Sequence, residues 1–546
     1  MLQPRKTQPS QLWPGLLAAL LLLPACSRQT DGLGTSDLAK ERPNLLIISI
    51  DTLRADALSC YGNQQETSPN IDALASSGVL FEQTTSTTSW TLPAHISMLT
   101  GLNISAHGIC DERLWGAVGM PGGPAELPLR GEFVSEPLYR AGYRTAGFFT
   151  WKYLDSDFGF GQGFQEWRRI GNTVWSDPEL KAKYDALVKS GATDELKQWT
   201  ASNPEQFDSQ APNTKGVVDA SLEWLDQEDG EPFFLFMHLF DVHDEYVAPE
   251  PFTTRFDPDY SGPVDGTEVS SALSKVNSRM PARDLQNLRA RYLGEVAWVD
   301  SQIGRLLAEL DKRGLRENTV VVLTSDHGEE FFEHGNKTHR TQLFPESIQV
   351  PLIFSWPGHI DAGRRVAEPV GIIDIAPTVS ALLDVPPPAS VSGRDLSVAL
   401  KGQDRLPPFP YLTELQLFQR GNMTPIRHTG LRLGDELFLR VVKRDGSESG
   451  VRFDLAKNPT GKGPGEPLDP AGFARFDELL DEVRINTLTE RELAPNRADL
   501  YQRLGKVVGD ELAGMGYLES DGDKPVTTSS KLCIDGCFAA PPKEAK

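Results

Sequence analysis

The chain has 546 residues, of which 39% are hydrophobic and 24% are charged. These proportions are typical of a globular protein with one large domain and a smaller one. The 54 basic and 76 acidic side chains give a formal net charge of -22, which argues against nucleic acid or a bulk anionic membrane surface as a partner. An anionic substrate would therefore need positive charge placed locally.

The N-terminus has the anatomy of an export signal. Arg5 and Lys6 precede an apolar run at 16–23, which is too short to span a bilayer, and Leu-Pro-Ala-Cys follows at 23–26. This tetrapeptide resembles a bacterial lipobox, in which the cysteine, here Cys26, is lipidated and becomes the new N-terminus. The alternative is cleavage after Ala25 that leaves Cys26 unlipidated. We expect a signal peptide over 1–26 and an anchored lipoprotein of the bacterial periplasm or outer membrane.

A polar segment at 27–42 fits a tether between that anchor and the folded body. Export also implies an oxidising compartment, in which the even number of remaining cysteines permits disulfides. Cys533 and Cys537 are close enough in sequence to pair, and Cys60 with Cys110 is a second candidate pair.

Apolar runs and helical patterns alternate along the body of the chain. The runs predict strands buried on both faces at 44–50, 144–150, 232–240, 319–324 and 350–354. Helical patterns lie at 70–77, 285–313 and 373–383. This alternation predicts an α/β fold with a large, mostly parallel sheet flanked by helices.

Proline-rich stretches at 386–388 and 406–410 mark a domain boundary, so we expect a catalytic domain over 43–405 and a C-terminal subdomain over 406–518. Runs at 436–442 and 451–453 around a charged turn predict antiparallel strands there. A following helix carries an apolar face that is expected to pack on that sheet, formed by Phe473, Phe476, Leu479, Leu480 and Val483. The remaining residues, 519–546, are predicted to form a polar tail.

Polar groups follow three of the predicted strands directly. Asp51 ends the first, Asp241 and His243 follow the third, and Asp326 and His327 follow the fourth. Because ligands of open parallel sheets bind at the carboxyl ends of strands, these groups are expected to converge. Carboxylates and neutral imidazoles are natural ligands of a divalent metal.

Thr91 opens the segment Thr-Leu-Pro-Ala-His before a short predicted helix that ends at Gly101. Threonine suits the N-cap position and glycine the exit of a helix. A helix N-terminus also attracts anions, so the hydroxyl of Thr91 is either a cap or a nucleophile placed beside a bound ester.

The motifs at 43–51, 68–75, 91–101, 326–328 and 350–353 resemble, in order, those of the sulfatases of the alkaline-phosphatase superfamily. The resemblance runs from about residue 43 to 518, with a family-like ending at Met515-Gly516-Tyr517-Leu518. It implies a large α/β sandwich around a mixed sheet, with a small C-terminal antiparallel sheet and helix.

The resemblance also implies roles for individual residues. Asp51, Thr91, Asp326 and His327 would bind a divalent metal, and Thr91 would also be the nucleophile. His243 would contact the ester group or protonate the leaving oxygen. His339 would do similar work from the opposite side, although it also reads as part of a basic loop.

Four positions depart from the family pattern. Thr91 stands where sulfatases carry the cysteine or serine that is oxidised to formylglycine, and a secondary alcohol would give a ketone instead. Thr52 replaces a second metal-binding aspartate, His327 an asparagine, and His95 an arginine that helps to hold the nucleophile. An imidazole in place of an oxygen ligand shifts the preference towards zinc or manganese, while calcium and magnesium remain compatible.

The sequence therefore predicts an exported, metal-dependent hydrolase of an anionic sulfate or phosphate ester on a glycan, lipid or small molecule, with Thr91 as nucleophile, aided by His95, His243 and His339. A transferase that moves a phospho-headgroup onto an envelope lipid or glycan is one alternative. An inactive sulfatase-like protein that binds anionic glycans or lipids is another, against which the complete set Asp51, Asp326 and His327 argues.

Overall fold

In a computed structural model of the chain, the residues described are 42–110, 131–171 and 214–493, with short gaps at 228–229, 268, 271–274, 403–404 and 420–421, and three residues between 183 and 187. The predicted signal peptide, Cys26, the tether up to residue 41, Cys533, Cys537 and the tail lie outside the described residues, as does the Met515–Leu518 motif. Cys60 and Cys110 are described, and no disulfide joins the two.

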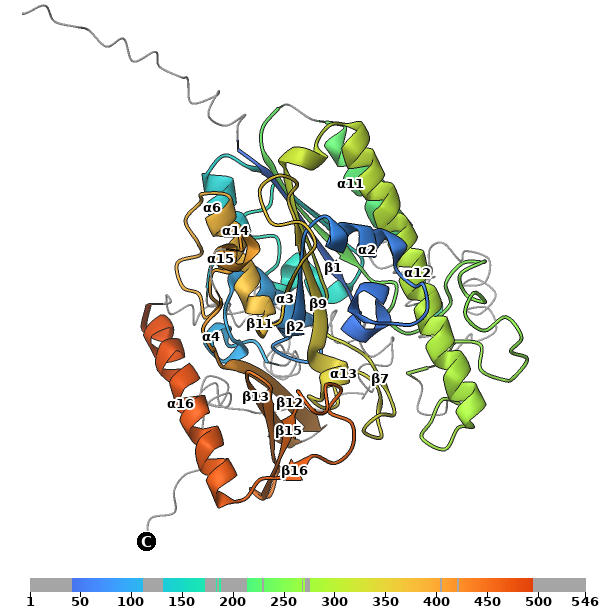
Figure 1. Ribbon diagram of the computed structural model, residues 1–546, viewed down its shortest axis with the longest axis vertical. Coiled ribbons are helices and arrows are strands. Elements are labelled where there is room, and N and C mark those ends of the chain that lie inside the picture. Colours follow the sequence, from blue (N-terminus) through green and yellow to red (C-terminus); the bar gives the residue numbers. More distant parts are fainter. Residues whose placement is uncertain are drawn as a thin grey trace, which may run out of the picture.

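A nine-stranded sheet forms the centre of the molecule (Figure 1), in the order β10-β2-β9-β6-β1-β5-β3-β4, with β11 paired to β2. Its strands are β1 (Asn44–Ile50), β2 (Val79–Thr85), β3 (Arg144–Phe149), β4 (Glu166–Arg169), β5 (Phe233–Leu239), β6 (Thr319–Thr324), β9 (Gln349–Ser355), β10 (Arg364–Val366) and β11 (Val370–Gly371). Among these strands β9 is antiparallel to β6 and β2, and the other pairs are parallel. The predicted α/β class with a mostly parallel sheet is confirmed.

Helices cover both faces of this sheet (Figure 1). One face carries α2 (Pro69–Ser76), α11 (Thr214–Leu225) and α12 (Ala282–Lys312), and the other carries α3 (Thr91–Thr100), α6 (Ser135–Arg140), α14 (Ile375–Leu382) and α15 (Ser397–Leu400). Side chains of β1 alternate between the two cores, since Leu45 and Ile47 join the α3 side while Leu46 and Ile48 join the α12 side. The predicted apolar runs are therefore strands buried on both faces.

A second, five-stranded antiparallel sheet follows, with the order β12-β13-β14-β15-β16. Its elements are β12 (Tyr411–Gln419), β13 (Asn422–Leu433), β14 (Glu436–Val442), β15 (Glu448–Asp454) and β16 (Glu466–Pro467), and α16 (Pro470–Leu493) packs against it. Phe476, Leu479, Leu480 and Val483 of α16 form a small core with Leu412, Leu431 and Phe438 of the sheet.

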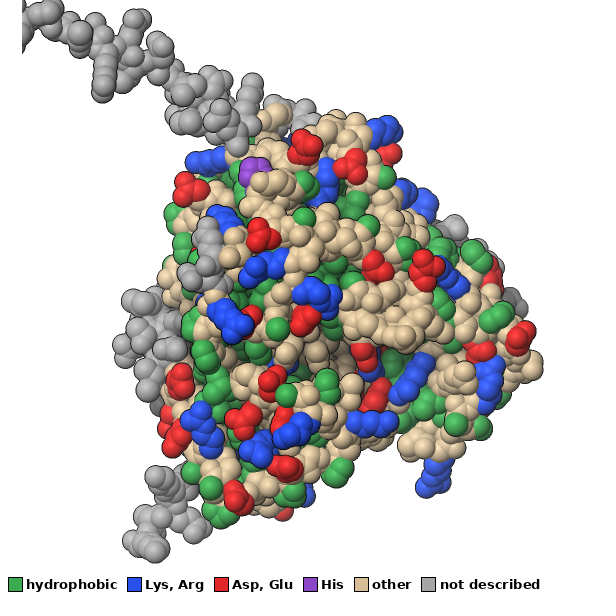
Figure 2. Space-filling model, in the orientation of Figure 1, with side chains coloured by type: hydrophobic (Ala, Val, Ile, Leu, Met, Phe, Trp, Pro, Cys, Tyr) green, Lys and Arg blue, Asp and Glu red, His purple; other side chains and the backbone are tan. Residues whose placement is uncertain are grey.

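On the face of the molecule drawn in Figure 2, acidic and basic side chains are interspersed rather than gathered into one patch. Within the described ranges, no helix combines the length and the apolar composition needed to cross a bilayer.

Candidate active site

The candidate site lies at the carboxyl ends of three adjacent parallel strands. Asp51 directly follows β1, and its backbone N–H donates to the carbonyl of Leu239 at the end of β5, at 2.9 Å. Asp326 and His327 lie just beyond the end of β6. Since β1 pairs in parallel with both β5 and β6, the three strand ends meet at one edge of the sheet.

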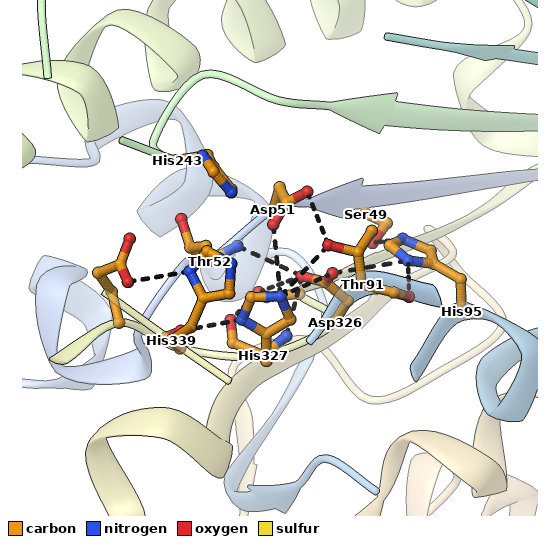
Figure 3. Close-up of polar contacts among 12 residues, drawn as sticks. Ser49, Asp51, Thr52, Thr91, His95, His243, Asp326, His327 and His339 are labelled. Carbon is orange, nitrogen blue, oxygen red and sulfur yellow. Dashed lines mark hydrogen bonds and ion pairs between the residues drawn. The ribbon is translucent and has the colours of Figure 1, made fainter. Parts of the chain in front are cut away.

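Asp51, Asp326 and His327 converge there, and each offers a ligand atom within 4.8 Å of the others. The His327 Nε2 atom lies 3.3 Å from Asp326 Oδ2 and 3.6 Å from Asp51 Oδ1 (Figure 3). The other ring nitrogen, Nδ1, lies 2.9 Å from the carbonyl of Gly328, an acceptor only. Nδ1 therefore carries the proton, and Nε2 presents its lone pair to the two carboxylates.

Each carboxylate in this cluster has one oxygen held by hydrogen bonds and one without a hydrogen-bond partner. Asp326 Oδ1 accepts from the backbone N–H groups of His327 at 2.9 Å and Thr52 at 3.3 Å. Asp51 Oδ2 accepts from His238 Nε2 at 3.1 Å. The remaining atoms, Asp51 Oδ1 and Asp326 Oδ2, are fully buried and accept no hydrogen bond.

Unpartnered buried oxygens are costly, and a cation would satisfy them. Burial raises the pKa of both aspartates, and repulsion from the Asp51 carboxylate raises the pKa of Asp326 further, to about 7. Burial lowers the pKa of His327 to about 3, which keeps its imidazole neutral, the form that binds a metal. Two carboxylates and one neutral imidazole, aimed at one point, fit a divalent metal ion.

Thr91 is the first residue of α3, and Trp90 holds the cap position. The prediction that Thr91 is the N-cap is therefore wrong by one residue. Its hydroxyl is directed to the aspartate cluster instead of the helix backbone, with Oγ1 at 3.5 Å from both Asp51 Oδ2 and His327 Nε2. The predicted exit is confirmed, because Gly101 caps the C-terminus with a φ of 72°.

His95 lies one helical turn after Thr91, behind it as seen from Asp51 (Figure 3). Its Nδ1 atom donates to the carbonyl of Thr91 at 2.9 Å, and Nε2 accepts from the hydroxyl of Ser49 at 2.9 Å. Burial lowers the pKa of His95 to about 4, consistent with this neutral form. Nδ1 is also 3.5 Å from Asp326 Oδ2, so the ring joins α3 to β1 and to the end of β6.

His243 and His339 lie on the far side of Asp51 from His95 (Figure 3), with ring centroids 4.7 Å apart. His339, in the loop after β8 (Lys337–Thr338), also lies 4.7 Å from the His327 ring. Burial alone would lower the pKa of His243, but the carboxylates of Asp244, Asp51 and Glu329 raise it. Burial lowers the pKa of His339 to about 3.

Asp241, which was expected to converge with His243 at the site, makes its contacts with α11 and α12 instead. Its Oδ2 atom accepts from the backbone of Thr214 at 2.8 Å and from the indole of Trp298 at 3.3 Å. It therefore ties β5 to α11 and α12, while His243 two residues later faces the site.

Three contributors were not singled out from the sequence: Ser49, His238 and Asp244. Ser49 and His238 are paired neighbours on β1 and β5, and both are fully buried. A single polar residue inside an otherwise apolar strand is the signal that would have found them. Asp244 follows His243 directly, within a run of polar residues that gave no reason to choose it.

Comparison with known proteins identifies the family of this chain. The sulfatase family model matches residues 43–385, more than half of the chain. An ulvan-active sulfatase of Formosa agariphila is 28% identical over 370 residues, which span 66% of this chain and 66% of that relative, just under two thirds of its length. An N-acetylglucosamine-6-O-sulfatase of Bacteroides thetaiotaomicron is 24% identical over 441 residues, or 67% of this chain and 72% of that protein.

Solved structures share the fold. A phosphonate monoester hydrolase of Agrobacterium radiobacter superposes with a TM-score of 0.61 at 21% identity, covering 82% of this chain and 96% of that one. A protein solved with its substrate D-glucosamine-2-N,6-O-disulfate gives a TM-score of 0.60 at 20% identity, covering 84% of this chain and 99% of that one. The fold is therefore alkaline-phosphatase-like, as expected, and by its family model and the order of its motifs the chain belongs to the sulfatase family.

Proposed function

We propose that the protein is a metal-dependent hydrolase of anionic esters in which Thr91 is the nucleophile, with phosphodiesters favoured over sulfate esters as substrates. One observation carries the proposal. The Thr91 hydroxyl lies 3.5 Å from both Asp51 Oδ2 and His327 Nε2, beside two buried carboxylate oxygens without hydrogen-bond partners.

Asp51, Asp326 and His327 would hold the metal, with Thr91 Oγ1 as a further ligand. Bound there, a divalent ion neutralises charge on the ester and lowers the pKa of the Thr91 hydroxyl. Relatives named as sulfatases and a structural neighbour named as a phosphonate monoester hydrolase support hydrolysis of sulfate or phosphate-type esters.

The proposed reaction has two steps. In the first, Thr91 Oγ1 forms a bond to phosphorus, the bond from phosphorus to the leaving oxygen breaks, and the Thr91 proton passes to Asp51 Oδ2. In the second, water attacks phosphorus, the bond from phosphorus to Thr91 Oγ1 breaks, and Asp51 Oδ2 returns its proton to Thr91 Oγ1. The proton that the water loses neutralises the leaving oxygen released in the first step. The backbone N–H groups at the start of α3 stabilise the negative charge that develops on the ester oxygens.

The identity of residue 91 favours phosphorus over sulfur. Sulfatases with formylglycine use the second hydroxyl of its hydrate to expel sulfate, and threonine has only one hydroxyl. A phospho-threonine is instead resolved at phosphorus by water. His95, which contacts the backbone of Thr91 but not its hydroxyl, is a positioning residue in this mechanism.

The test is a comparison of an aryl sulfate, a phosphate monoester and a phosphodiester, each assayed with and without added Zn²⁺ or Mn²⁺. We expect the highest kcat/KM for the phosphodiester, loss of turnover in Thr91→Ala, and a phosphate adduct on the peptide containing Thr91 after substrate trapping and mass spectrometry. Turnover of any of these esters that persists in Thr91→Ala would reject Thr91 as the nucleophile.

We also propose that the protein is exported and anchored through a lipid on Cys26. The support is the charged start, the apolar run at 16–23 and the Leu-Pro-Ala-Cys sequence. Labelled palmitate should enter the wild-type protein, and Cys26→Ala should release it from membranes. Anchoring that survives this substitution would contradict the proposal.

A further inference from the structure

His238 is a polar residue near the end of a strand that is otherwise apolar. It lies in β5, whose sequence is Phe-Phe-Leu-Phe-Met-His-Leu, and all seven residues are buried. Its side chain is fully buried, and its ring centroid lies 5.0 Å from that of His95. Burying an imidazole among apolar side chains is costly unless its nitrogens have hydrogen-bond partners. The contacts of this ring therefore indicate its role.

The ring of His238 holds one oxygen of a proposed metal ligand. Its Nε2 atom lies 3.1 Å from Asp51 Oδ2. Because an ionised carboxylate only accepts hydrogen bonds, Nε2 carries the proton of this contact. The other nitrogen, Nδ1, lies 3.5 Å from the hydroxyl of Thr150, which donates to it. Thr150 and His238 thus form a short chain of contacts that ends on Asp51 Oδ2.

The other oxygen of Asp51 faces the metal site. Asp51 Oδ1 is buried, accepts no hydrogen bond and lies 3.6 Å from His327 Nε2 (Figure 3). Oδ2 is engaged by His238 and lies 3.5 Å from the Thr91 hydroxyl. Asp51 is therefore oriented to offer a cation one oxygen, Oδ1, rather than both.

Asp326 is restricted in the same way, by backbone donors. Its Oδ1 atom accepts from the N–H groups of His327 at 2.9 Å and Thr52 at 3.3 Å, while Oδ2 is buried without a hydrogen-bond partner. Oδ2 lies 3.3 Å from His327 Nε2. The cluster thus presents single oxygens from two carboxylates together with one imidazole nitrogen.

Such a donor set distinguishes between divalent ions. Calcium takes about six to eight oxygen ligands and often binds both oxygens of one carboxylate. Zinc takes about four ligands, and imidazole nitrogen suits it well. A hydrogen bond that occupies one oxygen of a carboxylate therefore weakens calcium binding more than zinc binding.

We propose that His238 determines the metal preference of the site, because it holds Asp51 Oδ2, leaves Oδ1 alone for the ion and so disfavours calcium relative to zinc. His238 is then a positioning residue that acts through Asp51. The inference deepens the proposed function, since it rests on metal binding at Asp51, Asp326 and His327 and adds which ion is selected. It does not depend on Thr91 as the nucleophile or on which ester is hydrolysed.

The test is a competition between the two ions in His238→Leu and His238→Gln. Each protein is treated with chelator and dialysed against buffered mixtures of Zn²⁺ and Ca²⁺, and the bound metals are counted by mass spectrometry. Leucine has no hydrogen-bond donor. We expect the ratio of bound calcium to bound zinc to rise about tenfold or more, because loss of such a supporting hydrogen bond changes metal affinity by about 10–100-fold. Glutamine keeps an N–H donor and should restore most of the wild-type ratio.

The matched control is His107→Leu. His107 is also a fully buried histidine, but its nitrogens contact the hydroxyl of Ser97 at 3.0 Å and the backbone N–H of Ile109 at 3.1 Å. This variant should keep the wild-type ratio. Thr150→Val carries the comparison if His238→Leu does not fold. It removes the hydroxyl that contacts the ring of His238 and should shift the ratio in the same direction by a smaller factor.

An unchanged ratio in Thr150→Val and in every folded His238 variant would overturn the inference, and so would an equal rise in His107→Leu. Ester turnover is measured on the zinc-loaded wild type. Turnover together with an unchanged ratio rejects the role of His238 and leaves the proposed function standing. A shifted ratio without turnover of any ester does the reverse, and a wild type that binds neither ion rejects both.

Discussion

In Asp51, Asp326 and His327, hydrogen bonds hold one side-chain atom and leave a second atom directed towards the other two residues. His238 and Thr150 illustrate this, because the Thr150 hydroxyl lies 3.5 Å from His238 Nδ1 while His238 Nε2 is bonded to Asp51 Oδ2. The pair fixes one carboxylate oxygen, and Asp51 Oδ1 remains available. Such support determines the direction of a ligand atom before any metal binds.

We expect ester hydrolysis to depend on the hydroxyl of Thr91 and not on the branched shape of its side chain. Thr91→Ser keeps a hydroxyl on the same carbon, and we expect kcat to remain within about tenfold of the wild type. Thr91→Val keeps the branched shape without the hydroxyl and should lower kcat by about 10³-fold or more. Steady-state assays with a phosphodiester measure both, and equal activity in the two variants would show that the hydroxyl is dispensable.

We expect Asp51 to lower the free energy of unfolding of the metal-free protein, because its carboxylate is buried next to that of Asp326. Asp51→Asn removes that repulsion, so without metal the variant should be more stable than the wild type by about 0.5–2 kcal/mol. Burial raises the folded-state pKa of Asp51, so the wild type loses stability as pH rises above the ordinary carboxyl value of about 4. Asparagine does not titrate, and its advantage should therefore grow from about pH 5 to about pH 8.

Urea unfolding of chelator-treated samples at both pH values gives the comparison. Added Zn²⁺ should raise the unfolding midpoint of the wild type more than that of Asp51→Asn, reversing their order. A variant that is less stable than the metal-free wild type at both pH values would mean that Asp51 is held mainly by its hydrogen bonds.

At the scale of elements, α3 sets the position of Thr91, and the helix is fixed at its far end by Gly101. The Gly101 N–H donates to Ser97, and its carbonyl accepts from Ser392 and Gly393 at 2.7 and 3.0 Å. A Cβ at this position would lie 3.2 Å from the carbonyl of Ile373 and from Val391. The exit of α3 therefore has room for glycine and for little else.

Gly101→Ala should destabilise the fold by about 1–2 kcal/mol from the left-handed backbone alone, plus a packing term. The matched control is Gly108→Ala, at the exit of α4 (Ile104–His107), which has a positive φ of 82° but no atom within 4 Å of an added Cβ. Urea denaturation should show the larger loss for Gly101→Ala. Equal losses would indicate that the packing against Ile373 and Val391 relaxes without cost.

The strands that the sequence predicted are those buried on both faces of the sheet. Strands β1, β3, β5, β6 and β9 fall within one or two residues of the expected ranges, because each is a continuous apolar run. Strand β2 was not predicted, since only Val79, Leu80 and Phe81 are apolar before the polar half begins. Its place between β9 and β10 depends on pairing across the sheet, which no local pattern records.

The site was predictable for the same kind of reason. Asp51, Asp326 and His327 end apolar strands, where a polar residue is conspicuous, and the fold brings those ends together. His238 was missed because the apolar run around it was used only to predict a buried strand, and the single histidine within that run was not examined separately. Asp244 was missed because only the folded chain brings it beside His339, which lies 95 positions away.

At the scale of the whole molecule, the C-terminal sheet supports the segment that leads into Thr91. The backbone N–H of Glu414 on β12 donates to the carbonyl of Thr87 at 2.8 Å, and its carboxylate accepts from the N–H of Ser105 at 3.0 Å. Tyr411 of the same strand donates its hydroxyl to Asp374, at the start of α14, at 2.5 Å. The small sheet thus contacts the catalytic body on both sides of α3.

His334 makes a further connection between the two parts. Its Nδ1 atom lies 2.6 Å from Glu346 Oε1, and Nε2 lies 2.9 Å from the carbonyl of Gly461 and 3.1 Å from that of Gly463. All of these partners are acceptors, so only the protonated ring satisfies both nitrogens. Burial opposes protonation, but the hydrogen bond and charge of Glu346 raise the pKa of His334 above its ordinary value.

This raised pKa makes the connection dependent on pH. The stabilisation is complete below the unfolded-state pKa of about 6.5 and is lost as pH rises through the higher folded-state value. His334→Gln should therefore cost about 1–3 kcal/mol near pH 5.5 and clearly less near pH 9, as measured by urea unfolding. His359→Gln is the control, since His359 stacks on Trp356 with ring centroids 4.0 Å apart and should show a similar, small change at both pH values. A pH-independent loss in His334→Gln would mean that its edge-to-face contact with Phe453 of β15, 6.4 Å between centroids, holds the two parts together rather than its charge.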